Sequence, residues 1–366
     1  MRILIVKTSS LGDVLHTLPA LTDAMQAIPG LRADWVIEES FAEIPAWHPA
    51  VDRVIPVAIR RWRKQGWRSV RSGEVKHFVS TLRLLDYDHV IDAQGLIKSA
   101  VVARFARGRR SGLDKNSIKE SVASLFYQQR IAVPRAQHAV QRVRQLFSTV
   151  LGYTYNSDRI DYGVSRPVNP VDCATPGYVM FLHGTTWASK HWPEPYWREL
   201  ALLVSEAGRQ IKLPWGNLEE QQRALRIARG VPCVEVLGRQ TLTELAHQLA
   251  QSQGVVAVDT GLGHMAAAFN RPIVSVYGAT NPALSGTFGH FQQHLTSSLA
   301  CSPCMRRECA YQGQAMIDQS EGNPFEVKPA CYRSSPPALV FAQLQRLMLL
   351  AAQQPLADTG SPRSPS

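Results

Sequence analysis

The feature that most constrains the fold is a strand–turn–helix unit that recurs along the whole chain. Short apolar runs alternate with segments of helical spacing, and this alternation predicts mostly parallel sheets in an α/β fold. The helix after the first strand places Val14, Leu18, Leu21 and Met25 on one face, and the basic segment 60–68 is expected to be a loop. The strands expected lie at 2–7, 35–37, 54–55, 89–92, 178–182, 211–213, 234–236, 255–258 and 273–276.

The periodicity fades around 155–177, where several prolines cluster. A chain of 366 residues is long enough for two domains, so the boundary is expected there. Two doubly wound, Rossmann-like domains facing each other would leave a ligand cleft along the carboxyl ends of their strands. The predicted parts are an N-terminal domain at 1–165, a C-terminal domain at 166–335, a helix at 336–353 and a disordered tail at 354–366.

The charge balance is strongly basic, with 40 Lys and Arg against 29 Asp and Glu. Such a field favours nucleic acid, an anionic membrane face or a phosphorylated substrate. Basic residues are spread over the chain without a known nucleic-acid module, which argues against the first of these. No apolar run reaches the roughly 18 residues of a membrane span, and the N-terminal run is too short for a secretory signal. We therefore expect the chain to begin at Met1 and to stay in the cytoplasm.

The turn after the first strand, at 8–13, contains Gly12 and Asp13. Glycine lets the backbone approach a ligand, and the carboxylate could take a proton from an acceptor hydroxyl. Alternatively Asp13 only caps the following helix, and the turn by itself favours this second interpretation.

Two further turns lie in the second half, at 183–193 and 259–264. Their hydroxyl groups, free backbone N–H groups and Lys190 are what a pyrophosphate requires. The chain has no Walker motif and no G-x-G-x-x-G, which argues against a P-loop ATPase and a classical dinucleotide enzyme.

Four cysteines gather near the C-terminus, at Cys301, Cys304, Cys309 and Cys331. They could bind a structural zinc ion, or they could be reduced thiols in a structural loop. The long gap before Cys331 weakens the case for zinc.

Several strings are more specific than these turns, and over residues 1 to about 285 the chain resembles the ADP-heptose:lipopolysaccharide heptosyltransferases, glycosyltransferase family 9. The strings are VKTSSLGDVLHTLPALTDA at 6–24, VIPVAIRRWRK at 54–64, VIDAQGLIKSA at 90–100, ASLFY at 123–127, FLHGTTWASKHWPEPYWREL at 181–200, IKLPWGN at 211–217 and VDTGLGHMAAA at 258–268.

The resemblance implies a GT-B fold, with the acceptor on the N-terminal domain and the donor on the C-terminal one. It implies inverting transfer of heptose from ADP-L-glycero-β-D-manno-heptose to a 3-deoxy-D-manno-octulosonic acid (Kdo) residue of Kdo-lipid A, in lipopolysaccharide inner-core biosynthesis. No metal or cofactor is implied. We expect a monomer held peripherally on the cytoplasmic face of the inner membrane.

Carried over position by position, the resemblance makes Asp13 the base and Lys190 the cation that steadies the departing ADP. The residues expected to contact the diphosphate, ribose, adenine and donor heptose are Thr185, Thr186, Lys190, Glu220, Gln240, Asp259, Thr260, Gly261 and His264.

Basic side chains are expected to bind the Kdo carboxylates and lipid A phosphates, with Trp62 and Trp67 at the membrane interface. At Lys119 a lysine stands where relatives carry an acceptor-binding arginine. A solvated charge run is the alternative for the basic segment. The expected acceptor-binding residues are Arg60, Arg61, Arg63, Lys64, Lys98 and Lys119.

Two other functions remain open. One is a family 9 transferase with a different acceptor, and the other is a non-catalytic protein that binds a sugar nucleotide or lipopolysaccharide. The presence together of Asp13, Lys190 and Asp259 argues against the second.

Overall fold

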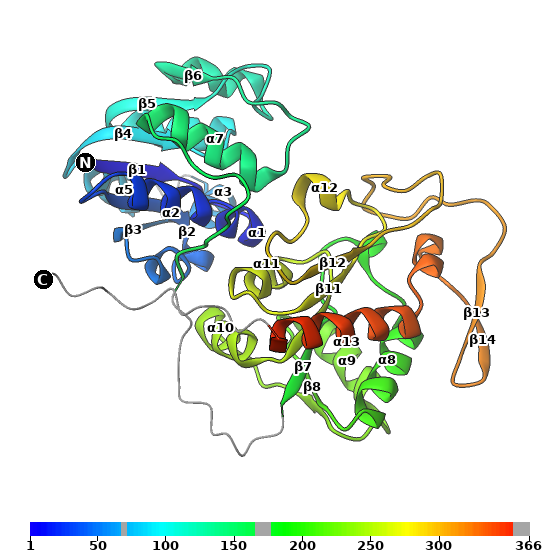
Figure 1. Ribbon diagram of the computed structural model, residues 1–366. Coiled ribbons are helices and arrows are strands. Elements are labelled where there is room, and N and C mark those ends of the chain that lie inside the picture. The colour runs from blue at the N-terminus through cyan, green and yellow to red at the C-terminus, as the bar shows by residue number, and fades with distance from the viewer. Residues whose placement is uncertain (67–71, 165–176, 354–366) are drawn as a thin grey trace, which may run out of the picture. The chain divides into compact units, whose positions relative to one another are not determined.

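The computed structural model describes residues 1–66, 72–164 and 177–353. The chain divides into two compact units, Met1–Val164 and Ser165–Ser366 (Figure 1). The predicted proline-rich boundary lies largely outside the described residues, and so does the predicted disordered tail at 354–366.

The first unit contains a parallel sheet of six strands in the order β3-β2-β1-β4-β5-β6. Its central strand is fully apolar from Ile3 to Val6 and is buried on both faces, as a parallel sheet requires. The strands are β1 (Arg2–Val6), β2 (Arg32–Glu38), β3 (Val51–Val57), β4 (Asp86–Asp92), β5 (Arg107–Leu113) and β6 (Gln129–Ile131).

Helices cover both faces of this sheet. On one face, Leu4 and Val6 pack with apolar residues of α5 (Glu74–Leu82) and α6 (Ile97–Phe105). On the other face, α2 (Leu18–Ala27) packs along α7 (Ala139–Leu151). The short elements are α1 (Leu11–Leu15), η1 (Glu39–Phe41), η2 (Pro45–Trp47), α3 (Ile59–Gln65) and η3 (Ser121–Phe126).

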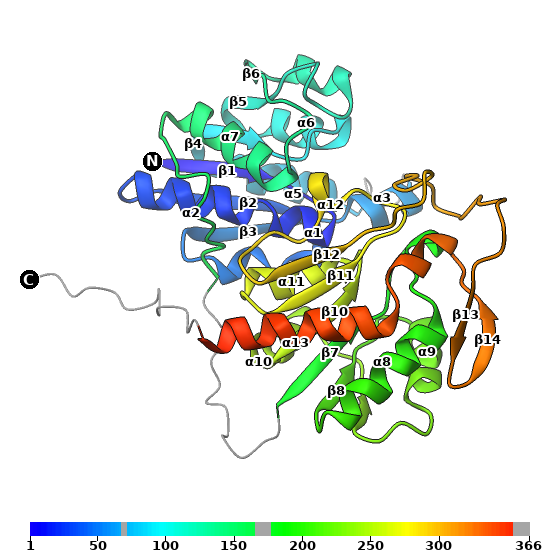
Figure 2. The same cartoon turned by 45° about the vertical axis from the view of Figure 1, so that its right-hand side comes forward.

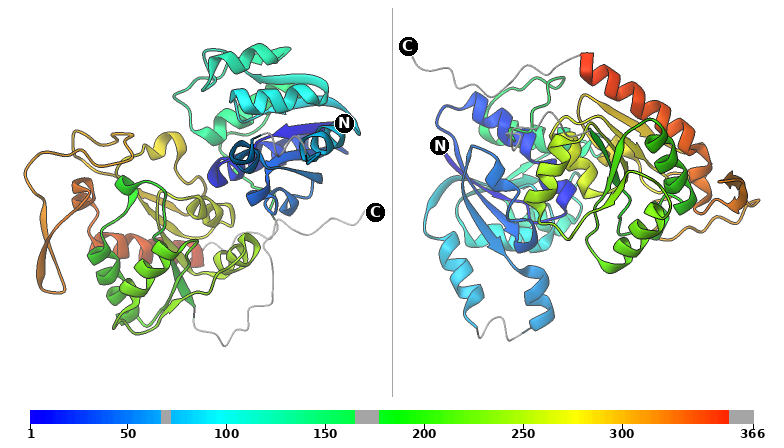
Figure 3. Two further views of the ribbon diagram at one scale, coloured as in Figure 1. Left: turned by 180° about the vertical axis from the view of Figure 1, so that it is seen from behind. Right: turned by 90° about the horizontal axis from the view of Figure 1, so that it is seen from below.

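The second unit repeats this plan with the strand order β12-β11-β10-β7-β8-β9. One face of its sheet packs on α8, α9 and α13, and the other lies against α10 and α11 (Figure 3). The bounds are β7 (Tyr178–Leu182), η4 (Ala188–Lys190), α8 (Glu194–Glu206), β8 (Gln210–Leu213), α9 (Leu218–Ala228), β9 (Val234–Val236), α10 (Leu242–Gln251), β10 (Gly254–Val258), α11 (Gly261–Ala268), β11 (Ile273–Val276), α12 (Pro282–Ser285), β12 (Gln292–Leu295), β13 (Ile317–Ser320), β14 (Asn323–Glu326), η5 (Ala330–Ser334) and α13 (Pro337–Gln353).

Two local predictions were wrong. The segment expected to be a basic loop at 60–68 is helical to Gln65, because arginine, lysine and glutamine are good helix formers, and residues 67 and 68 lie outside the described residues. Gly66 ends this helix with a φ of 55°. Two helices, α1 and α2, replace the single helix expected after β1. Pro19 has no backbone N–H to donate within a helix, so it is accommodated in the first turn of a second helix, α2.

In each unit the strand order reverses beside the first strand, between β1 and β4 and between β7 and β10. Loops leave the sheet in opposite directions at such a point, and ligands of doubly wound folds bind there. The turns singled out in the sequence, at 8–13, 183–193 and 259–264, all follow one of these strands.

Candidate functional site

Asp13 lies in the first turn of α1, directly beyond β1. Its Oδ2 accepts hydrogen bonds from the backbone N–H of Ser10 at 2.9 Å and from the Ser10 hydroxyl at 3.0 Å. Its Oδ1 lies 3.9 Å from Nζ of Lys7, and the side chain is 44% exposed. The expected capping contact is therefore present, and it leaves the carboxylate accessible to solvent.

The β1 turn is fastened to the turn that follows β4. Oε1 of Gln94 accepts hydrogen bonds from the backbone N–H groups of Thr8 and Ser9, each at 3.0 Å. Beneath Gln94, the buried carboxylate of Asp92 accepts bonds from its backbone N–H and from the Tyr127 hydroxyl. Burial raises the pKa of Asp92 above its ordinary value. These contacts hold the loop that carries Asp13 in one conformation.

The basic side chains around α3 differ in what they can bind. Arg61 forms ion pairs with Glu39 and Glu74, and hydrogen bonds to these two carboxylates raise its pKa. Trp62 donates to Glu74 at 2.8 Å and packs, partly buried, against the core. Trp67 lies outside the described residues.

The other expected acceptor residues are exposed. The guanidinium of Arg60 lies over the ring of Phe41. The exposed residues are Arg60, Arg63, Lys64, Lys98 and Lys119.

In the second unit, the loops beyond β7 and β10 meet through Lys190 and Asp259. Nζ of Lys190 lies 2.7 Å from Oδ2 of Asp259, and both side chains are largely buried, with 15% and 13% exposed. The Thr185 hydroxyl donates to the Asp259 carbonyl at 2.9 Å, and the Thr280 hydroxyl donates to its carboxylate at 2.6 Å. Lys190 also lies over the indole ring of Trp187.

The carboxylate of Glu220 spans the β7 and β8 loops. It accepts a bond from the backbone N–H of Gly216 at 2.7 Å. A Cβ at Gly184 would come within 2.7 Å of this carboxylate, so the close approach of the two loops depends on glycine there. Gly216 and Gly184 thus place Glu220 beside the β7 turn.

Thr260 is the N-cap of α11, and its side chain makes no capping bond. The amide end of this helix therefore faces the turn with its partial positive charge. His264 is buried within α11, and Thr186 lies in the β7 turn. Within the described part of the chain, Oε1 of Gln240 is buried without a hydrogen-bond partner.

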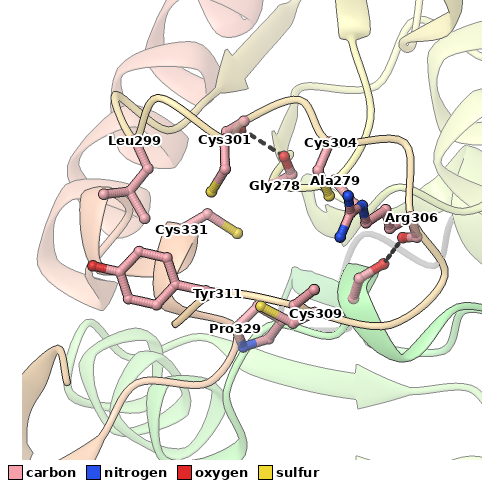
Figure 4. A pocket seen from close by; sticks show the side chains of 13 residues that line it. Gly278, Ala279, Leu299, Cys301, Cys304, Arg306, Cys309, Tyr311, Pro329 and Cys331 are labelled. Atoms are coloured by element: carbon pink, nitrogen blue, oxygen red, sulfur yellow. Dashed lines mark hydrogen bonds between the residues drawn. The ribbon is translucent and has the colours of Figure 1, made fainter. Parts of the chain in front are cut away.

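The four C-terminal cysteines line one cavity of about 420 Å³ in the second unit, together with Gly278 and Arg306 (Figure 4). Within residues 1–66, 72–164 and 177–353, no set of three or more His, Cys, Asp or Glu side chains is placed to hold a metal ion. Figure 4 shows the loop carrying Cys301, Cys304 and Cys309 arching over the buried Cys331.

Thiol reactivity should distinguish these cysteines. Burial raises the pKa of the Cys331 thiol to about 12, and the nearby Cys309 and Cys301 add to the shift. The thiolate is the reactive form, so at pH 8 we expect alkylation of Cys331 to be at least about 100-fold slower than that of the exposed Cys301. Iodoacetamide labelling followed by peptide mass spectrometry measures both rates; equal rates would contradict this environment.

The structure brings together the donor residues predicted on the β7, β8 and β10 loops, and it places Asp13 in the other unit. Two contacting residues were missed. Thr280 follows β11 at the same edge of the sheet, and a polar residue after a predicted strand could have indicated it. Trp187 lies inside a predicted turn, but nothing in its spacing indicates the contact with Lys190.

The model of glycosyltransferase family 9 (heptosyltransferase) matches residues 75–315. Lipopolysaccharide heptosyltransferase 1 of Pseudomonas aeruginosa is 50% identical over 95% of this chain and 98% of its own length.

Two solved structures of the Escherichia coli heptosyltransferase WaaC are also similar. The complex with ADP has a TM-score of 0.77 and 52% identity, covering 80% of this chain and 92% of that one. The complex with ADP-2-deoxy-2-fluoro heptose has a TM-score of 0.75 and 50% identity, covering 81% and 93%.

Proposed function

Because this chain belongs to glycosyltransferase family 9, the heptosyltransferases, we propose that it transfers heptose from ADP-heptose to a Kdo residue of Kdo-lipid A. It is a glycosyltransferase of lipopolysaccharide inner-core biosynthesis. The observation that carries the proposal is the convergence of Lys190, Thr185 and the start of α11 on one edge of the second sheet. This edge offers a cation and backbone amides for a diphosphate without a metal ion.

The proposed chemistry is an inverting displacement. A carboxylate takes the proton of the Kdo hydroxyl, the oxygen attacks the anomeric carbon, and the bond from that carbon to the phosphate oxygen breaks. ADP then departs with the bonding pair. Asp13 is the proposed base, because its carboxylate is exposed and its turn is held by Gln94. Lys190 and the amide end of α11 offset the negative charge that grows on ADP.

The remaining donor contacts are proposed from side-chain oxygens of the site that can still accept hydrogen bonds. Glu220 can accept hydrogen bonds from the ribose hydroxyls beside Gly184. Oε1 of Gln240 can accept one from the adenine amino group, which would satisfy an acceptor that is otherwise buried alone. Lys190 already pairs with Asp259, so the diphosphate must share this ammonium or displace the carboxylate.

The proposed acceptor is a lipid in which the Kdo sugar carries a carboxylate and the lipid A part carries phosphates. We assign its binding to Arg60, Arg63, Lys64, Lys98 and Lys119, with Arg61 held by its own carboxylate pairs. Along the described residues, no helix combines the length and apolar character needed to traverse a bilayer. Peripheral attachment at the cytoplasmic face of the inner membrane, as a monomer, is the arrangement that we propose.

The direct test mixes the protein with ADP-heptose and Kdo-lipid A and follows ADP release together with the mass of the lipid product. We expect release only when both substrates are present, with a product heavier by one heptose. Donor binding without release would favour the non-catalytic alternative. Release only with another acceptor sugar would favour the related transferase.

A further inference from the structure

Helix α6 exposes an apolar stripe that the transfer chemistry does not use. Ile97, Val101 and Phe105 are each between 37% and 42% exposed. At about 100° per residue these three side chains fall within an arc of about 80° on the helix. The opposite side of α6 is buried against the sheet through Val102 and Ala103. The helix is therefore apolar on two sides, only one of which the sheet covers.

A neighbouring element enlarges this surface. In η3, Val122 and Leu125 are 53% and 68% exposed, and residues three apart lie on one side of a 3-10 helix. The two elements share a buried cluster that includes Ala100 and Ala123. Helix α6 packs against η3 and against β4 and β5 of its sheet (Figure 2). We call these five exposed side chains the α6 patch: Ile97, Val101, Phe105, Val122 and Leu125.

Positive charge surrounds the α6 patch. Around the helix axis, Arg104 lies about 20° beyond one edge of the apolar arc and Lys98 about 20° beyond the other edge, so one cation borders each side. Both side chains are exposed. Across residues 97–130 there are eight basic residues and two acidic ones, Asp114 and Glu120. Glu120 is already engaged by the backbone N–H of Ile97.

We propose that the α6 patch docks on the surface of an anionic lipid bilayer, with its apolar side chains among the acyl chains and Lys98 and Arg104 on headgroup phosphates. Apolar surface bordered by lysine and arginine is the composition that binds such an interface. A symmetric contact between two copies would instead bring identical cations together. The inference rests on the proposed function, since a lipid acceptor has to be reached at a membrane.

Vesicle binding tests the proposal with the full chain. Sedimentation with phosphatidylethanolamine–phosphatidylglycerol vesicles should carry down the wild type, and phosphatidylcholine vesicles should carry down far less. V101S/F105S should weaken binding by about 10-fold or more, because two apolar side chains leave the interface. K98Q/R104Q should weaken it by about 30-fold at low salt.

The matched control is L349S/L350S, which removes two exposed leucines from α13 and should bind vesicles like the wild type. V101S/F105S should keep wild-type turnover on a water-soluble, deacylated Kdo acceptor, and this readout confirms its folding. Equal vesicle binding by wild type and V101S/F105S would overturn the proposal. So would a wild-type dimer that V101S/F105S converts to monomer, because the patch would then bind a second copy.

The two proposals fail separately. If the wild type transfers heptose but does not bind anionic vesicles, the docking proposal is contradicted and the proposed function is not. If the wild type binds vesicles through the α6 patch but transfers no heptose, the proposed function is contradicted. The docking proposal is then supported by the vesicle-binding data alone.

Discussion

Replacing Asp13 by asparagine should lower kcat for heptose transfer by about 10²–10⁴-fold, the usual contribution of a general base. Asparagine keeps an oxygen that can accept the two bonds from Ser10, so the start of α1 should remain intact. It cannot take a proton from the acceptor. The affinity for ADP, measured by calorimetry, should be close to that of the wild type, because the donor residues belong to the second unit.

Asp13→Ala provides the comparison that separates the two roles of this carboxylate. It removes both the base and the capping contact, so it should lose the same activity and also about 0.5–2 kcal/mol of unfolding free energy. Denaturant unfolding of both variants measures the difference. If Asp13→Asn retains wild-type turnover, Asp13 serves the helix alone and the base lies elsewhere.

Replacing Lys190 by alanine should lower kcat by about 10²–10³-fold and weaken ADP binding, because a fixed cation no longer offsets the charge on the departing diphosphate. Among the described residues, the same change leaves the largely buried carboxylate of Asp259 with Thr280 as its remaining side-chain hydrogen-bond partner. We expect this to cost about 1–3 kcal/mol of stability. Single-turnover rates, ADP calorimetry and thermal unfolding measure the three effects.

Two further variants make this result specific. Lys212→Ala removes a lysine of similar burial that also lies over an aromatic ring, Tyr178, and near a carboxylate, Glu235. It lies within β8, away from the candidate site, and should keep near-normal activity. The double variant K190A/D259N should regain stability without regaining turnover. Normal turnover in Lys190→Ala would exclude the lysine from leaving-group stabilisation.

The two sheets show how much of the fold the residue pattern could predict. The strands expected at 178–182, 234–236 and 273–276 are confirmed at those bounds. The first and the third are buried along their whole length, whereas 234–236 is a partly exposed strand at the edge of the sheet. β5 was missed because RGRRSGL carries three arginines and two glycines and has no apolar run. Its place in the sheet comes from pairing with β4 and β6, which no local pattern reveals.

The candidate site divides in the same way. Its turns could be predicted, since small and hydroxyl residues after an apolar strand are visible in the chain itself. The partner of Trp62 could not be predicted, because Glu74, which accepts its indole N–H, lies on the next described helix. The contact of Thr280 with Asp259 likewise joins the ends of two strands that only the sheet order makes neighbours.

From the amino-acid order alone came the alternation of strands and helices, the positions of the polar turns and the family to which they belong. Those features depend on neighbouring residues, through the spacing of apolar side chains and the chemistry of short turns. Which cations are free to bind a ligand was decided only by the tertiary structure. Arg61 and Arg63 look alike in the chain, yet of these two only Arg61 forms ion pairs with carboxylates among the described residues, because ionic contacts form between groups that folding brings within a few ångströms.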